Sequence, residues 1–142
     1  MPKAATFRND FLKLLFNAVA IANIADNAAA SPLTNLYLAL HTSDPGTADA
    51  QTTNEISYGS YARVAVARSG AGWVVTANSV SPAANVDFPT ASSGSATATH
   101  ASIGTASAGT GKILWSGVLG ASIAVSTGTT PRITTGSTIT ET

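Results

Sequence analysis

The sequence predicts a mainly β protein, a jelly-roll-like antiparallel β-sandwich that carries one N-terminal α-helix. Helical spacing of apolar residues occurs once, before about residue 27. After it, short runs of alternating apolar and polar residues are separated by turns rich in glycine, serine and proline. About eight such runs are typical of a two-sheet sandwich or jelly roll, and the lack of a second helical pattern disfavours a parallel βαβ sheet.

The predicted helix extends from Ala4 to about Asp26. Two apolar rows follow helical spacing and leave only a narrow polar stripe for water. The rows are Phe7, Phe11, Leu14, Ala18, Ile21 and Ala25, and then Leu12, Leu15, Phe16, Val19 and Ile24. An apolar surface this wide exceeds what a helix needs to cover its own sheet. We expect either a helix buried deeply in one subunit or a helix shared with a partner subunit.

The N-terminal segment is expected to remain part of the folded protein. Its apolar run is too short and too polar for a transmembrane helix, which needs about 20 mainly apolar residues. Charged residues beside the run and asparagines within it are also unlike a signal peptide. Because Ser31-Pro32 ends the helical pattern, we expect residues 1–30 to form a helical arm and residues 31–142 to form a single β-sandwich domain.

The central feature of the β region is a predicted hairpin. Strands over residues 61–68 and 73–77 are joined by the glycine-containing turn at residues 69–72. Residues 47–57 lack periodicity and are expected to form a long loop, which in a compact fold tends to be functional or mobile. The other expected strands are residues 33–42, 79–82, 84–88, 95–103 and 112–119. Residues 123–126 continue the last pattern after Gly120, and residues 132–135 and 137–140 form an alternating Thr/Ile tail.

The composition excludes several functional classes. Ala, Thr, Ser and Gly make up more than half of the 142 residues, whereas only 10% are charged. Seven basic and seven acidic residues give a formal net charge of zero, so the chain lacks the field that gathers nucleic acid or anionic lipid. Without cysteine it has neither disulfides nor thiolate chemistry. We interpret the weakly charged surface of small residues as favouring assembly.

No motif for catalysis or metal binding stands out. His41 and His100 are the two histidines, and neither is accompanied by a recognisable nucleophile motif, so we interpret both as structural. Asp44, Asp49 and Glu55 fall in one loop, but their spacing does not match a calcium-binding loop. We therefore expect no enzyme activity, no metal and no cofactor.

Two arginines lie close in sequence to aromatic residues. Arg63 and Arg68 near Tyr58, Tyr61 and Trp73 are a faint version of a nucleic-acid-binding pattern. A salt bridge across the predicted hairpin, or a contact at the rim of a protein interface, explains the arginines equally well. Tyr and Arg are also enriched among the residues that contribute most to protein interfaces.

Four segments of the chain resemble small structural proteins of tailed bacteriophages. They are LYLALHTSDPG (36–46), YARVAVARSGAGWVV (61–75), VDFPTASSGSATATHASIGTASAGTGKILWSGVL (86–119) and TPRITTGSTIT (130–140). Such proteins are often labelled tail-fibre or head-fibre proteins, and the best understood are capsid cement, or decoration, proteins. The resemblance implies a jelly-roll-type domain that forms homo-oligomers and clamps neighbouring major-capsid subunits from outside the shell. It brings no catalytic residues.

The leading functional hypothesis is therefore a virion structural protein on the capsid exterior, made in the host cytoplasm. Its expected partners are the phage major capsid protein and further copies of itself, with no role for nucleic acid or membrane. We predict Phe11, Leu15, Tyr58, Tyr61 and Arg63 as its contact residues.

The alternative hypothesis is a tail-associated module that binds a receptor or a carbohydrate. In that case exposed aromatic rings would stack on sugars. The candidate rings are Tyr37, Tyr58 and Trp73.

Overall fold

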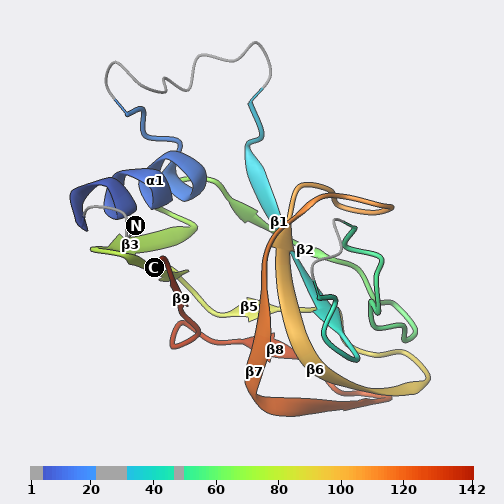
Figure 1. Ribbon diagram of the computed structural model, residues 1–142. Coiled ribbons are helices and arrows are strands. Elements are labelled where there is room, and N and C mark those ends of the chain that lie inside the picture. Colours follow the sequence, from blue (N-terminus) through green and yellow to red (C-terminus); the bar gives the residue numbers. More distant parts are fainter. Residues whose placement is uncertain (1–4, 22–31, 47–49) are drawn as a thin grey trace. The chain divides into compact units, whose positions relative to one another are not determined.

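The computed structural model describes residues 5–21, 32–46 and 50–142 (Figure 1). These residues form one helix and nine strands, and the pairs β1–β6, β3–β4, β4–β9 and β6–β7 are antiparallel, which confirms the mainly β prediction and is consistent with a β-sandwich. The elements are α1 (Ala5–Asn17), β1 (Asn35–His41), β2 (Val64–Ala67), β3 (Trp73–Thr76), β4 (Ser79–Pro82), β5 (Val86–Asp87), β6 (Ser95–Gly104), β7 (Ile113–Ser126), β8 (Arg132–Ile133) and β9 (Ile139–Thr140).

The chain divides into two compact units, each assembled from segments that are distant in sequence. One unit comprises Met1–Asn35, Val66–Val86 and Ile133–Thr142, and the other comprises Leu36–Ala65 and Asp87–Arg132. The helix α1 therefore belongs to a unit that also contains β3, β4 and the C-terminal β9. The separation into an arm before residue 31 and one domain after it stays a prediction.

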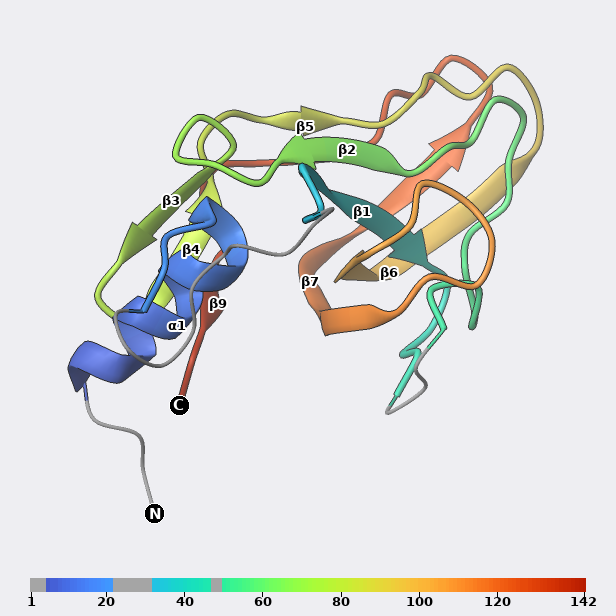
Figure 2. The ribbon, with the colours of Figure 1, turned by 90° about the horizontal axis from the view of Figure 1, so that it is seen from above.

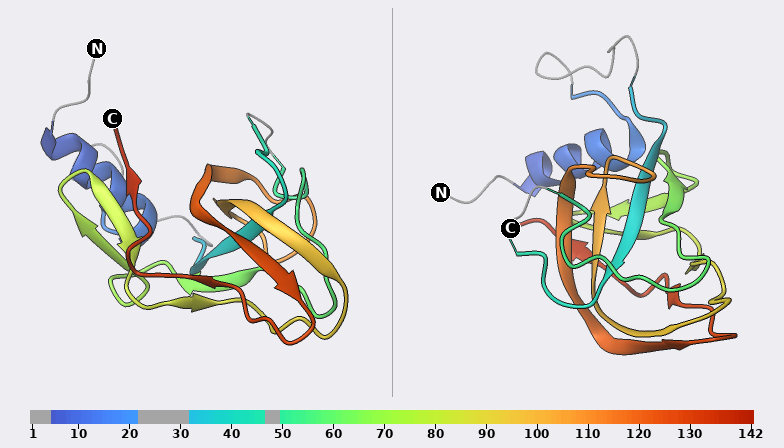
Figure 3. Two further views of the ribbon diagram at one scale, coloured as in Figure 1. Left: turned by 90° about the horizontal axis from the view of Figure 1, so that it is seen from below. Right: turned by 90° about the vertical axis from the view of Figure 1, so that its right-hand side faces the viewer.

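In the helical unit, α1 packs on the small antiparallel sheet formed by β3, β4 and β9 (Figures 1 and 3). Leu12 and Phe16, one helical turn apart, are fully buried. The Phe16 ring meets the edge of buried Trp73 with ring centroids 4.8 Å apart. On the other apolar row, Phe7 stays 38% exposed. The helix is therefore not enclosed all round within the described part of its subunit.

The helix ends at Asn17, which corrects the prediction that it continues to about Asp26. Ala18 adopts a left-handed conformation (φ 56°), and the Val19 amide donates to the Lys13 carbonyl at 3.1 Å. The Arg68 guanidinium donates to the carbonyls of Leu14 and Leu15. Together these bonds satisfy backbone oxygens that have no partner inside a helix. The rest of the predicted helix, residues 22–26, lies outside the described residues.

The predicted central hairpin is wrong. β2 pairs with β1 in a four-stranded sheet, whereas β3 pairs with β4 through a register that places Val75 opposite Val80. The turn at residues 69–72 directs the chain from one sheet to the other. At Gly72, a Cβ atom would lie 2.1 Å from the Ala67 carbonyl oxygen, so this position admits glycine only. The glycine was a correct sign of a tight turn but not of strand pairing.

The larger sheet has the strand order β2-β1-β6-β7 (Figure 2). β1 pairs with β6 so that Leu38 faces Ile103 and His41 faces His100. Leu36, Leu38 and Leu40 are all buried, as the alternation predicts. Ala39 and His41 on the opposite face are also buried, so β1 is covered on both sides.

The long strand β7 replaces two strands that the sequence predicts separately (Figure 3). Residues 113–118 pair with β6 up to Val118 opposite His100, and the pairing resumes with Ile123 opposite Ala98. Residues 119–122 thus oppose one β6 residue, Thr99, which makes a bulge of the kind that bends a strand. Gly120 lies in this bulge, which explains why the apolar alternation breaks there.

β5 and β8 form a two-stranded sheet. Arg132 Nη2 donates to Asp87 Oδ2 at 2.9 Å, and this pair lowers the pKa of Asp87 and raises that of Arg132. Both side chains are about half exposed, so solvent screens the attraction and the pair adds little to stability.

Candidate functional site

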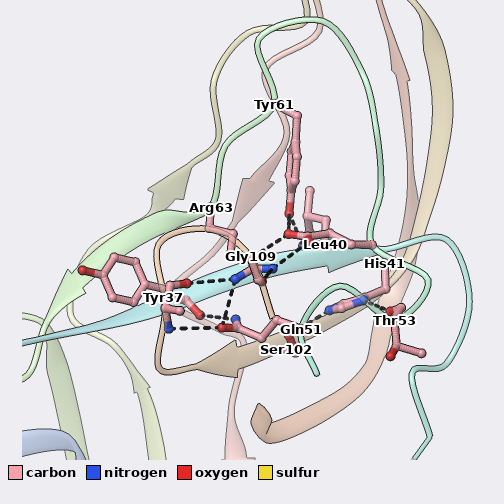
Figure 4. A network of polar contacts seen from close by, with 11 residues as sticks. Tyr37, Leu40, His41, Gln51, Thr53, Tyr61, Arg63, Ser102 and Gly109 are labelled. Carbon is pink, nitrogen blue, oxygen red and sulfur yellow. Dashed lines mark hydrogen bonds and ion pairs between the residues drawn. The ribbon is translucent and has the colours of Figure 1, made fainter. Parts of the chain in front are cut away.

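A buried polar network joins two loops to β1 in the second unit (Figure 4). At its centre, Arg63 binds Glu55 in a two-pronged ion pair, with Nε to Oε1 and Nη2 to Oε2 both at 2.7 Å. The Arg63 side chain is 2% exposed and that of Glu55 is 15% exposed. This hydrogen bond to Glu55 raises the pKa of Arg63. Both charges are therefore paired inside the subunit.

The remaining Arg63 donors hold the loop between β6 and β7. Nη2 donates to the Gly109 carbonyl at 2.7 Å, and Nη1 donates to the Ala106 carbonyl at 3.0 Å and to Gln51 Oε1 at 3.4 Å. A guanidinium has five N–H donors, and all five find an acceptor here. Arg63 thus fixes this loop from within.

Gln51 is the second anchor of the network and is fully buried. Its Nε2 donates to the Tyr37 carbonyl at 3.1 Å, and its Oε1 accepts from the Ala106 amide at 3.3 Å. The space for its side chain depends on glycine, because a Cβ at Gly104 would lie 2.1 Å from the Gln51 Cδ. The described residues 50–57 of the predicted long loop are therefore tied to the sheet, while residues 47–49 lie outside the description.

Tyr61 connects the ion pair to an aromatic cluster. Its hydroxyl donates to Glu55 Oε1 at 2.9 Å and accepts from the Leu40 amide at 3.2 Å, while burial raises its pKa. Its ring packs edge-on against Tyr58 at 5.2 Å and stacks with Phe88 at 6.3 Å. The phenol is therefore held neutral as a structural cross-link.

His41 lies in the same unit between β6 and the loop at residues 50–56. Nδ1 lies 2.8 Å from the Thr53 carbonyl, and Nε2 lies 2.8 Å from Ser102 Oγ. Because a carbonyl only accepts, Nδ1 carries the proton in the neutral ring, and Nε2 accepts from the serine hydroxyl. Burial lowers the pKa of His41, which favours this neutral form.

The Ser102–His41 contact has the order of a nucleophile, a base and an orienting group. His41 is 0% exposed and Ser102 is 2% exposed, however, so no substrate reaches the hydroxyl in this conformation. The donors and acceptors of the network bind one another inside the subunit. The role of the network is therefore to hold the two loops against β1. His41 thus connects the loop at residues 50–56 to β6 at this end of the sheet.

The five predicted contact residues fall into two groups. Phe11 and Leu15 are half-buried on α1. Tyr58, Tyr61 and Arg63 are drawn together in the second unit, where Tyr58 and Arg63 are each 8% exposed. The structure thus gives the latter three residues internal roles, and contact with a partner stays a prediction for all five.

The other sequence candidates also have internal roles. Asp44 accepts from the Gly46 amide at 2.8 Å within its turn, and Glu55 binds Arg63. Asp49 lies outside the described residues. Among the described residues, no group of three or more acidic, histidine or cysteine side chains is placed to hold a metal ion. No helix in that part of the chain is long and apolar enough to cross a membrane.

Sequence reasoning missed Gln51 and Ser102. Each is an uncharged polar residue in a stretch rich in similar residues, so neither has a periodic signal that predicts burial. Gly104 and Gly111 gave an indirect signal, because both leave room for the Gln51 side chain. The reason for these two glycines is clear only in the folded protein, where the loop that carries Gln51 lies against the loop between β6 and β7.

Comparison with known proteins gives one family. A family model described as "Podophage GP4 fiber I protein gp80" matches residues 7–141, nearly the whole chain. No curated protein matches the chain.

Proposed function

The chain belongs to the podophage GP4 fiber I protein gp80 family, and we propose that it binds the outside of the phage capsid and bridges neighbouring major-capsid subunits. Membership of this family makes it a virion structural protein rather than a member of an enzyme family. The finer role, that of a cement protein acting as a homo-oligomer, is our proposal. The family match over residues 7–141 supports the virion role, and the observation that carries the proposed capsid contact is the partly exposed apolar side of α1.

The placement of the charged residues supports a role in adhesion. Arg63 and Glu55 bind each other, and Arg68 binds carbonyls at the end of α1. The formal net charge is zero, and many of the exposed residues are Ala, Ser, Thr or Gly. Such a surface packs closely against a partner without strong repulsion, and attachment at many equivalent capsid sites adds modest affinities together.

Helix α1 supplies the contact residues in this proposal. Phe7 is 38% exposed, and Phe11 and Leu15 are half-buried, so this side of the helix retains apolar surface. Phe11 and Phe7 pack together with ring centroids 6.4 Å apart. We propose that this aromatic pair and Leu15 contact the capsid. Tyr58, Tyr61 and Arg63 stabilise the subunit, and their contact with a partner stays a prediction.

Particles that lack the protein test the cement role. We expect them to lose their DNA or rupture at a lower temperature than complete particles, and purified protein added back to restore the original temperature. Protein with Phe7→Ser and Phe11→Ser should restore less, provided that it remains folded. Equal heat resistance of particles with and without the protein would contradict the proposal.

The tail-associated alternative remains because the family is described as a fibre protein. Two of its three candidate sugar-stacking rings are unsuitable, since Trp73 is 1% exposed and Tyr58 is 8% exposed. Tyr37 is half-buried. Electron microscopy of particles carrying a labelled copy separates the two proposals: label over the shell supports the cement role, and label at the tail supports the alternative.

A further inference from the structure

Helix α1 has two apolar sides, and the larger one does not face its sheet. Leu12 and Phe16 form the covered side and are fully buried, with the Phe16 ring against Trp73. About a third of a turn away around the helix axis lies a second side, which we call the open side. It comprises Phe7, Phe11, Leu14 and Leu15. Phe7 is 38% exposed and the other three are half-buried, so the open side keeps apolar surface in water.

Apolar burial does not by itself select the covered side. The hydrophobic effect is roughly proportional to the apolar area removed from water, and it has no direction. The open side carries two phenylalanines and two leucines, whereas the covered side carries one of each. A helix held by apolar contacts alone could therefore bury more apolar area by turning the open side onto the sheet. The observed setting of the helix needs a further cause.

Arg68 holds the C-terminal end of α1 in one rotational setting. Its Nη2 donates to the Leu14 carbonyl at 2.6 Å, and its Nε donates to the Leu15 carbonyl. Successive carbonyls lie about 100° apart around a helix axis, and the guanidinium donors are fixed in one plane. A rigid group that binds both carbonyls therefore fixes the rotation of the helix as well as its position along the axis. Arg68 is itself anchored, since its amide donates to the Thr34 carbonyl at 2.9 Å.

Asn9 holds the other half of the helix. Its Nδ2 donates to the Ala77 carbonyl at 2.8 Å, in the turn between β3 and β4. Asn9 precedes Leu12 and Phe16 by three and seven residues, so it lies toward the same side of the helix. A rotation that moved these two residues off the sheet would break the Asn9 bond as well as the bonds of Arg68. Hydrogen bonds are directional, so both contacts resist a rotation that apolar packing would permit.

We propose that Arg68, assisted by Asn9, is a positioning residue that selects the rotational setting of α1 and keeps the open side outward. A polar contact in an apolar interface can specify one packing, because the alternative packing loses it. Phe7, Phe11 and Leu15 are the residues proposed to contact the capsid. The inference therefore deepens the proposed function and rests on it for one consequence, which is capsid binding. The rotational setting itself is a property of the isolated protein.

Cysteine labelling reports the setting, because the chain has no cysteine of its own. Phe7→Cys places a single thiol on the open side, and Leu12→Cys places one on the covered side. We expect iodoacetamide to label position 7 about tenfold faster than position 12, since a buried group reacts only after local opening. Adding Arg68→Met should slow labelling at position 7 and speed it at position 12, so that the two rates become similar. An unchanged ratio of the two rates would overturn the proposal.

A residue that only kept the helix folded would give a different result. If Arg68→Met melted α1, both positions would be labelled quickly and the helical circular dichroism signal would fall, which would also overturn the proposal. Arg132→Met is the matched control, because it removes an exposed arginine of the other unit and should leave the ratio unchanged.

Two further variants of the polar contacts sharpen the labelling test. Arg68→Lys keeps the charge but lacks the planar fork, so it should also lower the ratio, and full retention of the ratio would contradict the role of the fork. Asn9→Ala removes one hydrogen bond at the other half of the helix. It should lower the ratio less than Arg68→Met does, and it provides the measurement if Arg68→Met does not fold. An unchanged ratio in Asn9→Ala would contradict the assistance of Asn9.

Co-sedimentation with phage particles separates this inference from the proposed function. Arg68→Met should bind particles less than the original protein does, although every proposed contact residue is still present. If the original protein does not sediment with particles, the capsid contact is wrong while the labelling result still decides the rotational setting. If Arg68→Met shows the changed labelling ratio but binds particles as well as the original protein does, the setting is not needed for capsid binding, and that consequence is overturned.

Discussion

Arg63 is a charged residue that stabilises the interior of the protein. Its side chain is 2% exposed, yet each of its N–H groups meets an acceptor, and Glu55 neutralises its charge. A buried charge without a partner is strongly unfavourable, so the stability of this region depends on the complete set of contacts.

Arg63→Met tests this dependence. The substitution preserves an apolar chain of similar length but leaves the Glu55 carboxylate without its partner. We expect a loss of about 3 kcal/mol in the free energy of unfolding, measured with urea, because breaking a buried ion pair leaves an uncompensated charge. The control is Arg132→Met, which breaks the half-exposed pair with Asp87 and should change stability little. If the two variants lost the same free energy of unfolding, the buried Arg63 pair would stabilise the protein no more than the half-exposed Arg132 pair, which would contradict the prediction.

His41 makes stability depend on pH. Burial lowers its pKa below the ordinary value of 6.5, so folding favours the neutral ring. The stabilisation is complete above that value and is lost as the pH falls below it, because the unfolded chain then binds a proton that the folded chain resists. We expect the free energy of unfolding to fall by at most about 1.4 kcal/mol per pH unit from this residue as the pH falls below about 6.5.

The His41→Gln variant should show a shallower fall in stability over this range, measured by urea unfolding at a series of pH values. Its matched control is His100→Gln, at the half-buried histidine that stands outside the Thr53 and Ser102 contacts. If the steep fall in stability persisted in His41→Gln and vanished in His100→Gln, His100 and not His41 would cause it, which would contradict the prediction.

At the scale of the element, α1 has apolar residues that are fully buried and others that are partly exposed. Leu12 and Phe16 are 0% exposed, whereas Phe7 is 38% exposed. The wide apolar surface in the sequence therefore serves two purposes: one side packs on the unit's own sheet, and the other is available to a partner in our proposal.

Separate substitutions of Phe16 and Phe7 distinguish the role of α1 in stability from its proposed role in binding to particles. Phe16→Ala removes a ring that packs against Trp73 and should cost about 3 to 5 kcal/mol in the free energy of unfolding. Phe7→Ala should cost much less, because its ring is partly in water already, but should weaken binding to particles. Thermal unfolding and co-sedimentation with particles measure the two effects. Comparable destabilisation by both variants would contradict the division.

The strands show where local pattern stops being informative. Alternation correctly located strands near residues 33–42, 73–77, 79–82 and 95–103. It did not predict that β2 joins β1 while β3 joins β4, because alternation describes which residues are buried and not which strand covers them. The helix end was missed for a similar reason, since Arg68 caps it from far along the chain.

At the scale of the whole molecule, the chain passes repeatedly between the two units. Four crossings, after residues 35, 65, 86 and 132, mean that neither unit is a continuous piece of sequence. Contacts between distant segments must form before either unit is complete, which makes such folds slow to assemble. The same arrangement allows segments near both chain ends, α1 and β9, to share one unit.

The sequence by itself determined the mainly β class, the single helical pattern, the neutral charge and the lack of thiol chemistry, because these follow from composition and local periodicity. The salt bridge across the predicted hairpin, one of the alternatives that the sequence left open for Arg63, is not formed: Arg63 binds Glu55, which precedes the hairpin residues in a loop. Only the tertiary structure decided the strand partners, the end of α1 and the burial of Arg63, Gln51 and His41. Each of these depends on groups far apart along the chain, whose meeting no local pattern records.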